Sequence, residues 1–325
     1  MKRTVPGLFI VLLVLSACAA SGGTPGGSSG ESPGESSGGS SPPGGSDDQG
    51  AIEHPTGSDP ILVVDSAGGF VPVQFMATRL PMFVMLGDGR VIMQGMQTLE
   101  FPGPALTPLI ERTLTEEGIQ AVLGEVEATN LFTSDLDLRG AQNVIADAAD
   151  TIFILNAGGQ EVTISIYGLG ALPPDMEAPP GVPSGEIEAH RILGGLNEGL
   201  MTLDTILPAD AWEAEGWQPY EPEAFRLYVR DVTSEPIEGG DLPEQVREWP
   251  TEDDPGAFGE EVSFFGDGTR CGVVDGELGV TWLAELNAAT QMTLWTDDGD
   301  RRFSVMARPV LPHEDPACPD LGGAG

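Results

Sequence analysis

The chain has 325 residues, of which 51 are acidic and 14 are lysine or arginine, so its formal net charge is −37. Nucleic acid and anionic lipid headgroups repel such an acidic body, which argues against binding to DNA, to RNA or directly to a membrane surface. We expect its partners to be cations, neutral glycans or basic protein patches. Alternatively, the charge only keeps the protein soluble and monomeric.

Residues 1–17 have the pattern of a secretion signal. Met1-Lys2-Arg3 is positively charged, an apolar run extends from Val5 to Leu15, and Leu15-Ser16-Ala17-Cys18 closes it. This pattern resembles the lipobox of bacterial lipoproteins, which implies cleavage before Cys18, a diacylglyceryl group on its sulfur, and attachment of the protein to the outer face of the cell membrane. The apolar run is shorter than the about 20 residues of a membrane-spanning helix. Secretion with a free Cys18 thiol is the alternative.

Residues 18–60 predict a flexible tether after the signal. They are almost wholly Gly, Ser, Pro and acid, with too few apolar groups to offset the entropy of ordering them. Cleavage removes Lys2 and Arg3 and no acid, so the net charge changes from −37 to −39 and no lysine remains. Chemistry that needs a lysine, such as a Schiff base or a Walker motif, is thereby excluded.

Residues 61–215 predict a first α+β unit. Met82 to Leu86 and Val91 to Gln94 read as strands around a Gly-Asp-Gly turn, where glycine accepts the positive φ that the turn requires. A helix follows, because Thr115 can cap it and two glutamates suit its positive end. Thr151 to Tyr167 alternates apolar and polar residues and predicts a second hairpin.

A long helix and a group of aromatic residues follow. Leucines at steps of three and four residues predict an amphipathic helix from about Gly185 to Leu207, packed against a sheet of its own chain. Trp212, Trp217 and Tyr220 predict a hydrophobic plug that joins the two halves, or alternatively a platform for sugars.

Residues 216–319 predict a second α+β unit, followed by a disordered tail at 320–325. Val262 to Phe265 reads as a strand before a Gly-Asp-Gly turn, Leu278 to Ala289 as a helix, and Met292 to Val310 as a hairpin. The fold class is therefore α+β, with antiparallel sheets built from hairpins and packed helices. The shared order suggests two related ββ-α-ββ units, unless so common a turn recurs by chance.

Three cysteines fit one lipid anchor and one disulfide. If Cys18 carries lipid, Cys271 and Cys318 remain as an even pair in an oxidising compartment, so we expect a bond between them. The alternative is two free buried thiols. No Cys-x-x-Cys spacing favours a redox or metal role.

The folded part also resembles secreted lipoproteins of high-GC Gram-positive-type bacteria. The likeness rests on Phe83-Val84-Met85-Leu86-Gly87-Asp88-Gly89-Arg90-Val91-Ile92, on the acidic start of the first helix, and on Arg308-Pro309-Val310-Leu311-Pro312 before Cys318. These motifs are structural. The resemblance implies a location and a fold, and it implies no activity.

No catalytic, metal or cofactor site is predicted. The histidines have no metal-ligand spacing, and the acidic clusters read as turns and solvated loops. Weak calcium binding by the second cluster stays open. The residues concerned are His54, His190 and His313, and the clusters Asp135/Asp137, Glu252/Asp253/Asp254 and Asp297/Asp298/Asp300.

The sequence favours a non-enzymatic, lipid-anchored module that binds a protein or glycan partner of the cell envelope. The alternative is a carboxylate-based glycan hydrolase, which needs two facing carboxylates about 5 to 10 Å apart in a cleft. A third hypothesis is a weak calcium-binding module. A binding module instead predicts an exposed apolar patch without such a carboxylate pair.

We predict that protein from the producing cells begins at Cys18 and that the sulfur carries a diacylglyceryl group. Mass spectrometry of the N-terminal peptide checks this. An unmodified thiol at Cys18, or an intact leader on protein recovered from the cytosol, would contradict the prediction.

Overall fold

Two mixed β-sheets and five α-helices make up the part of the chain that the computed structural model describes, residues 50–173, 176–236 and 245–319. The fold is α+β, as predicted. All of these residues belong to one compact unit. Cys18 and the tail at 320–325 lie outside the described residues, so the predictions made for them remain predictions. None of the described helices combines the length and the hydropathy that crossing a bilayer requires.

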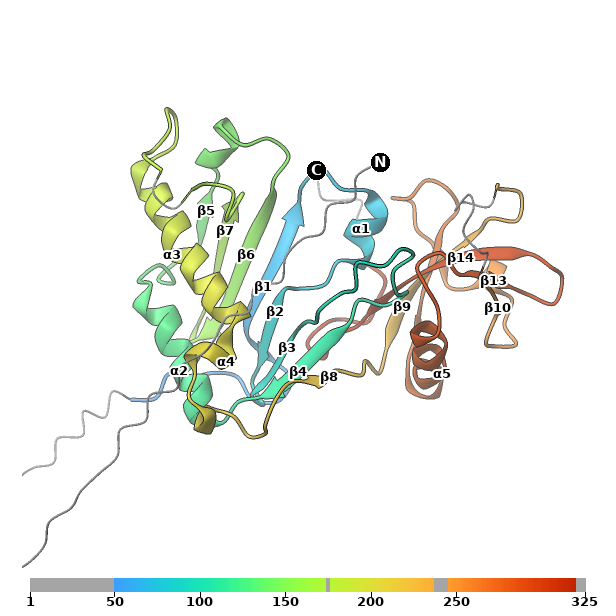
Figure 1. Cartoon of the computed structure of the whole chain (residues 1–325), viewed down its shortest axis with the longest axis horizontal. Coiled ribbons are helices and arrows are strands. Elements are labelled where there is room, and N and C mark those ends of the chain that lie inside the picture. The colour runs from blue at the N-terminus through green and yellow to red at the C-terminus, as the bar shows by residue number, and fades with distance from the viewer. Residues whose placement is uncertain (1–49, 174–175, 237–244, 320–325) are drawn as a thin grey trace, which may run out of the picture. The chain divides into compact units, whose positions relative to one another are not determined.

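The first sheet has eight strands in the order β5-β7-β6-β1-β2-β3-β4-β8, and all neighbours are antiparallel except β5 and β7 (Figure 1). Its strands are β1 (Pro60–Gly68), β2 (Phe83–Leu86), β3 (Arg90–Gln94), β4 (Leu109–Thr113), β5 (Leu136–Leu138), β6 (Ala149–Ala157), β7 (Gln160–Tyr167) and β8 (Gln218–Pro219).

The second sheet has six strands in the order β10-β13-β14-β9-β12-β11, with β10 and β13 parallel. Its strands are β9 (Phe225–Asp231), β10 (Val246–Glu248), β11 (Glu260–Glu261), β12 (Arg270–Val274), β13 (Leu294–Thr296) and β14 (Arg302–Pro309). The helices are α1 (Val73–Thr78), α2 (Glu116–Ala128), α3 (Ser184–Met201), α4 (Leu203–Ile206) and α5 (Gly276–Asn287), with short 3-10 turns η1 (Gly140–Asn143), η2 (Ala209–Ala211) and η3 (Pro255–Ala257).

The first sheet buries both faces at its centre. Successive side chains of a strand point to opposite faces, so Val64 and Met85 face one way while Val63 and Val84 face the other. The first face packs against α2 and α3, which Figure 1 shows lying together over one side of the sheet. The second face packs against the C-terminal segment through Leu311.

The helices of this layer lie where the sequence predicts helices, with one difference. The Thr115 side chain accepts a hydrogen bond from the Gly118 N–H at 3.2 Å, which confirms the predicted cap of α2. The single helix expected from Gly185 to Leu207 is instead two helices. Thr202 has a non-helical φ of −130° and separates α3 from α4.

The predicted hairpins of the first sheet are confirmed as β2–β3 and β6–β7. The aromatic plug is placed differently from the prediction. Trp212 and Trp217 pack edge to face, with ring centroids 5.7 Å apart, in the core between the first sheet and its helices. Tyr220 packs against the opposite face of the same sheet. These rings therefore belong to the first sheet.

The second sheet also buries two faces. Phe225, Leu227 and Val229 of β9 pack with Trp282 of α5 on one face. Tyr228 of the same strand points to the other face, where it joins Ala77 of α1 and the disulfide. Both faces of β9 are thus covered.

The predicted strand at Val262 to Phe265 is wrong. This segment is a loop between β11 and β12, closed by a hydrogen bond from the Val262 N–H to the Thr269 carbonyl. The backbone of this loop does not continue the sheet, but two of its side chains cover it. Phe264 and Phe265 both pack edge to face on Tyr228. The predicted helix and the final hairpin are present as α5 and β13–β14.

The two expected ββ-α-ββ units are not confirmed. In the first sheet β1 lies between β2 and β6, which are the first strands of their hairpins. In the second sheet β9 lies between β12 and β14, which are second strands. Each sheet has a central strand between two pairs of strands. In the first sheet the central strand contacts the first strand of each pair, whereas in the second sheet it contacts the second strand of each pair.

The folded body begins before residue 60. The Ile52 N–H donates to the Gln120 side chain, the Gly158 N–H donates to the Glu53 carbonyl, and the Gly87 N–H donates to the Asp59 carbonyl. The composition of this stretch is that of a tether, yet its backbone groups pair with α2 and with the turns of two hairpins. The boundary set from composition is therefore too late by about eight residues, because hydrogen bonds of the main chain leave no trace in composition.

A C-terminal strap, residues 310–318, connects the two sheets. Leu311 packs on the first sheet, and Cys318 packs on the second. Cys318 is bonded to Cys271 of β12, which confirms the predicted disulfide. The bond fixes the end of the strap to the second sheet.

We predict that replacing both Cys271 and Cys318 with serine destabilises the protein by about 4 kcal/mol, because the bond closes a loop of 47 residues and restricts the unfolded chain. Urea unfolding of the double variant beside the wild type measures the loss. Equal stability of the two proteins would show that the disulfide contributes nothing.

Candidate functional site: a cavity beside β14

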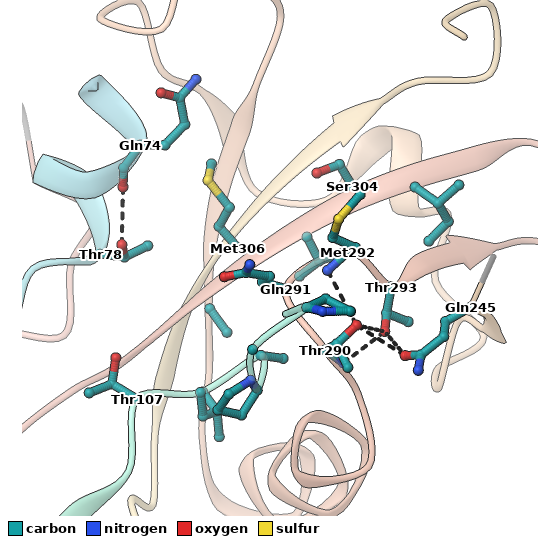
Figure 2. A pocket seen from close by; sticks show the side chains of 18 of the residues that line it. Gln74, Thr78, Thr107, Gln245, Thr290, Gln291, Met292, Thr293, Ser304 and Met306 are labelled. Carbon is teal, nitrogen blue, oxygen red and sulfur yellow. Dashed lines mark hydrogen bonds between the residues drawn. The ribbon is translucent and has the colours of Figure 1, made fainter. Parts of the chain in front are cut away.

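A cavity of about 730 Å³ lies between α1, the loop 97–107 after β3, and the second sheet. Figure 2 shows Gln74 and Thr78 of α1 on one side, with Ser304 and Met306 of β14 between them and Gln245. This volume is in the range of small-molecule and peptide sites. The walls come from segments far apart in sequence, so the site exists only when the chain is folded.

Ten uncharged polar side chains line the cavity, beside apolar ones. Four of the ten glutamines in the chain gather here, although acidic residues outnumber glutamines fivefold in the sequence. Their amides can donate and accept hydrogen bonds, as can the hydroxyls beside them. The uncharged polar lining residues are Gln74, Thr78, Gln97, Thr98, Thr107, Gln245, Thr290, Gln291, Thr293 and Ser304.

A hydrogen-bonded cluster fixes one end of the cavity. The Thr290 and Thr293 hydroxyls each donate to the Gln245 side-chain oxygen at 3.0 Å, as Figure 2 shows. The Gln291 N–H donates to the Gly103 carbonyl, and the Ala105 N–H donates to the Ala289 carbonyl. These bonds attach the loop after β3 to the segment that precedes β13.

Arg230, Glu235 and Arg302, three of the four charged lining residues, have partners nearby. Arg230 forms ion pairs with Glu235 and with Asp267. Arg302 donates to the Thr233 carbonyl at 3.0 Å. Glu100 also lines the cavity. The site therefore presents mainly neutral side chains to a ligand, some apolar and some able to form hydrogen bonds.

Exposed apolar side chains lie on two of the segments that form the cavity. Phe75 on α1 is 54% exposed, and Met96, Leu99 and Phe101 on or next to the loop after β3 are 97%, 104% and 65% exposed. Phe75 lines the cavity, as do Gln97, Thr98 and Glu100 between the other three. Exposed apolar groups that gather near a cavity are typical of an interaction surface.

Two arginines hold the α1 wall in place. The Arg308 guanidinium donates to the Arg79 carbonyl at the end of α1 at 2.8 Å. Arg79 in turn donates to the carbonyls of Ser66 and Gly68 in β1, at 2.8 and 2.9 Å. The α1 wall is thus attached to β14 on one side and to β1 on the other.

Glu314 of the strap neutralises Arg308. The two side chains form a bidentate ion pair with both N–O distances at 2.6 Å, and their exposed fractions are 9% and 15%. Burial by itself raises the pKa of Glu314, but the Arg308 hydrogen bonds and charge, the Leu311 N–H and the Arg226 charge lower it below 4.5 overall. Burial raises the pKa of the neighbouring Asp65.

The sequence-predicted residues lie elsewhere and have structural partners. Asp135 accepts from the Thr163 N–H, and Asp254 and Asp297 both pair with Arg301. Among the described residues, no three His, Cys, Asp or Glu side chains are grouped to hold a metal ion. The acidic clusters thus belong to turns.

The histidines are also separate. His54 contacts Glu116 at 3.2 Å, and His190 is buried on α3. Burial lowers the pKa of His190 and of His313. No two of the three share a site.

Sequence reasoning missed the cavity residues. They come from α1, the loop after β3, β9, residue 245, the turn before β13, and β14, so no motif or spacing connects them. One signal was present. The run Met96-Gln97-Thr98-Leu99-Glu100-Phe101 carries three large apolar side chains, yet it belongs to no described strand or helix.

No family model matches the sequence, and neither a curated protein nor a solved structure matches it. The chemistry of the cavity is therefore the basis for assigning a function.

We predict that Glu314→Gln lowers the free energy of unfolding at pH 7 by about 3 to 5 kcal/mol, because it leaves the Arg308 charge buried without a counter-ion. Exchanging both partners, as Arg308→Met with Glu314→Gln, should cost less than the sum of the single changes. Glu188→Gln, in the exposed pair with Arg191, is the control and should change little.

The sign of the pH dependence follows from the lowered pKa of Glu314. The stability that ionised Glu314 contributes is fully present above its ordinary pKa of 4.5, and it is lost as pH falls through the pKa of the folded state. The raised pKa of Asp65 gives stability a pH dependence of the opposite sign. The difference in the free energy of unfolding between wild type and Glu314→Gln therefore isolates the effect of Glu314. A difference that stays constant from pH 7 to pH 3 in urea titrations would contradict this assignment.

Proposed function

We propose that the protein is a non-enzymatic binding module of the cell envelope, anchored by lipid on Cys18, and that the cavity beside β14 is its binding site. The observation that carries the proposal is a hydrogen-bonding, mainly neutral cavity in a chain of net charge −37. A mainly neutral cavity suits a neutral partner. The acidic surface of the rest of the chain disfavours anionic partners and nucleic acid.

The exposed apolar residues on α1 and on the loop after β3 support the same proposal. Phe75, Met96, Leu99 and Phe101 are exposed side chains whose burial by a partner is favourable, at about 25 cal/mol for each Å² removed from water. A tether of Gly, Ser and Pro gives the body reach from the membrane. The proposed location, extracytoplasmic and lipid-anchored, follows from the signal pattern alone.

A carboxylate hydrolase is the competing proposal. Glu100 and Glu235 line the cavity, and Glu235 forms an ion pair with Arg230. A general acid in glycan hydrolysis must give its proton to the leaving group, whereas the Glu235 carboxylate is already held by an arginine. Peptidoglycan cleavage by purified protein, abolished by Glu100→Gln or Glu235→Gln, would establish catalysis and contradict the binding-only proposal.

We predict that a photo-crosslinking amino acid at Leu99 or Phe101 captures the same envelope component in intact cells. The control position is Val280, which is 68% exposed and lies on α5, a helix that contributes no residue to the cavity lining. Mass spectrometry of the crosslinked species identifies the component. Capture of nothing at the cavity positions, or of the same species at Val280, would contradict the proposed site.

A further inference from the structure

The cavity contains an open strand edge. β13 begins at Leu294, opposite Ser304, while β14 continues past this point to Pro309. On its other side β14 stays paired with β9 along this whole stretch, as far as Phe225. From Val305 to Pro309, therefore, β14 has a partner strand on one side only.

The ladder geometry shows which backbone groups face the cavity. The Val232 N–H donates to the Arg302 carbonyl, and the Val310 N–H donates to the Ala224 carbonyl. Because bonding groups alternate along an antiparallel strand, Met306 also bonds to β9, and Ala307 directs its N–H and C=O to the opposite side. On that side no hydrogen bond joins Ala307 to any described residue.

Val305, Ala307 and Pro309 all line the cavity, so the open edge is one of its walls. An N–H and a C=O pointing from a strand edge are satisfied best by the backbone of another strand. Extended peptides bind to such edges, where main-chain hydrogen bonds give affinity and side-chain subsites give selectivity. The edge from Val305 to Pro309 is about 16 Å long, which suits four or five extended residues. Its pairing groups are those of Val305 and Ala307, because Pro309 has no N–H and its carbonyl accepts from the Arg308 guanidinium.

The remaining lining distinguishes a peptide from a glycan. Amides and hydroxyls, such as Gln74, Thr78 and Gln291, complement peptide groups. Sugar sites use aromatic platforms, and Phe75 is the one aromatic side chain among the described lining residues. An uncharged segment loses no charge solvation on entering a neutral cavity, whereas an acidic segment is also repelled by the chain as a whole.

We propose that the cavity binds an extended, uncharged peptide segment of a partner protein, which adds to the second sheet as a short strand along Val305–Pro309 of β14. This inference rests on the proposed function, because it assigns a ligand class to the same site.

Hydrogen exchange of the free protein, followed by NMR, tests the open edge directly. The Ala307 amide should exchange faster than the amides of Met306 and Arg308, which bond to β9. Equal protection of the three amides would overturn the inference, because β14 would then have no free edge.

Peptide binding tests the strand addition. The probe is an array of uncharged heptapeptides of Thr, Val, Gln and Ala, with the strongest binder then titrated into the full chain. N-methylation of alternate residues removes the N–H groups that face one side only. One set of methyl groups should weaken binding about tenfold or more, and the other set should have little effect.

Ala307→Pro is the matching change in the protein. Proline removes the N–H that faces the cavity and leaves the bonds of Met306 and Arg308 to β9 in place, and prolines are tolerated at strand edges. It should weaken binding about tenfold, whereas Ala307→Gly, which keeps the N–H, should bind nearly as wild type. If the proline variant fails to fold by circular dichroism, the methylated peptides decide alone.

The outcomes separate this inference from the function that it rests on. Binding that is indifferent to both sets of methyl groups overturns strand addition and leaves a binding site in the cavity. Binding of an N-acetylglucosamine tetramer instead of any peptide, with NMR shifts at Gln74 and Thr290, overturns the peptide class only. If no probe binds and the crosslinks at Leu99 and Phe101 also fail, both proposals fall.

Discussion

The buried ion pair between Arg308 and Glu314 is the interaction on which the arrangement of the two sheets depends. Arg308 stands on the central part of the second sheet, and its guanidinium also bonds to the end of α1, which Arg79 attaches to the first sheet. A buried guanidinium is costly unless each donor is paired. The pair therefore contributes less to the total free energy of unfolding than to the selection of one arrangement of the sheets. Any other placement of α1 or of the strap would leave one of the two charges buried without its partner.

The strap and the disulfide make that arrangement resistant to separation of the sheets. Leu311 fills the second face of the first sheet, and Cys318 is covalently held on the second sheet. Between them, Glu314 is fixed opposite Arg308, and Arg226 donates to the carbonyls of Asp315 and Pro316. A short segment thus combines an apolar contact, a charge pair and a covalent bond, so the walls of the cavity are attached to a rigid framework.

Local signals in the sequence were sufficient for the hairpins and for α2, whose determinants lie within a few residues of one another. The Gly-Asp-Gly turn between β2 and β3 and the Thr115 cap are such signals. The central strands β1 and β9 were not predicted, because Ile61 to Val64 and Phe225 to Val229 are buried on both faces and show no alternation. Cysteine parity predicted the disulfide, whereas the cavity needed six distant segments to meet, which no local pattern encodes.

The distribution of charge connects the fold with its proposed function. Acidic residues at the described turns are paired with arginines or accept backbone N–H groups, as Asp135, Asp254 and Asp297 do. The cavity instead gathers glutamine and threonine around a strand edge that β13 leaves unpaired. An exposed edge is a liability, since it pairs with any extended chain that reaches it. Here the edge forms one wall of a cavity, and the strongly negative body repels acidic chains. A cavity admits a narrow extended segment more readily than a second sheet, so the features that limit aggregation are also those that would select the proposed partner.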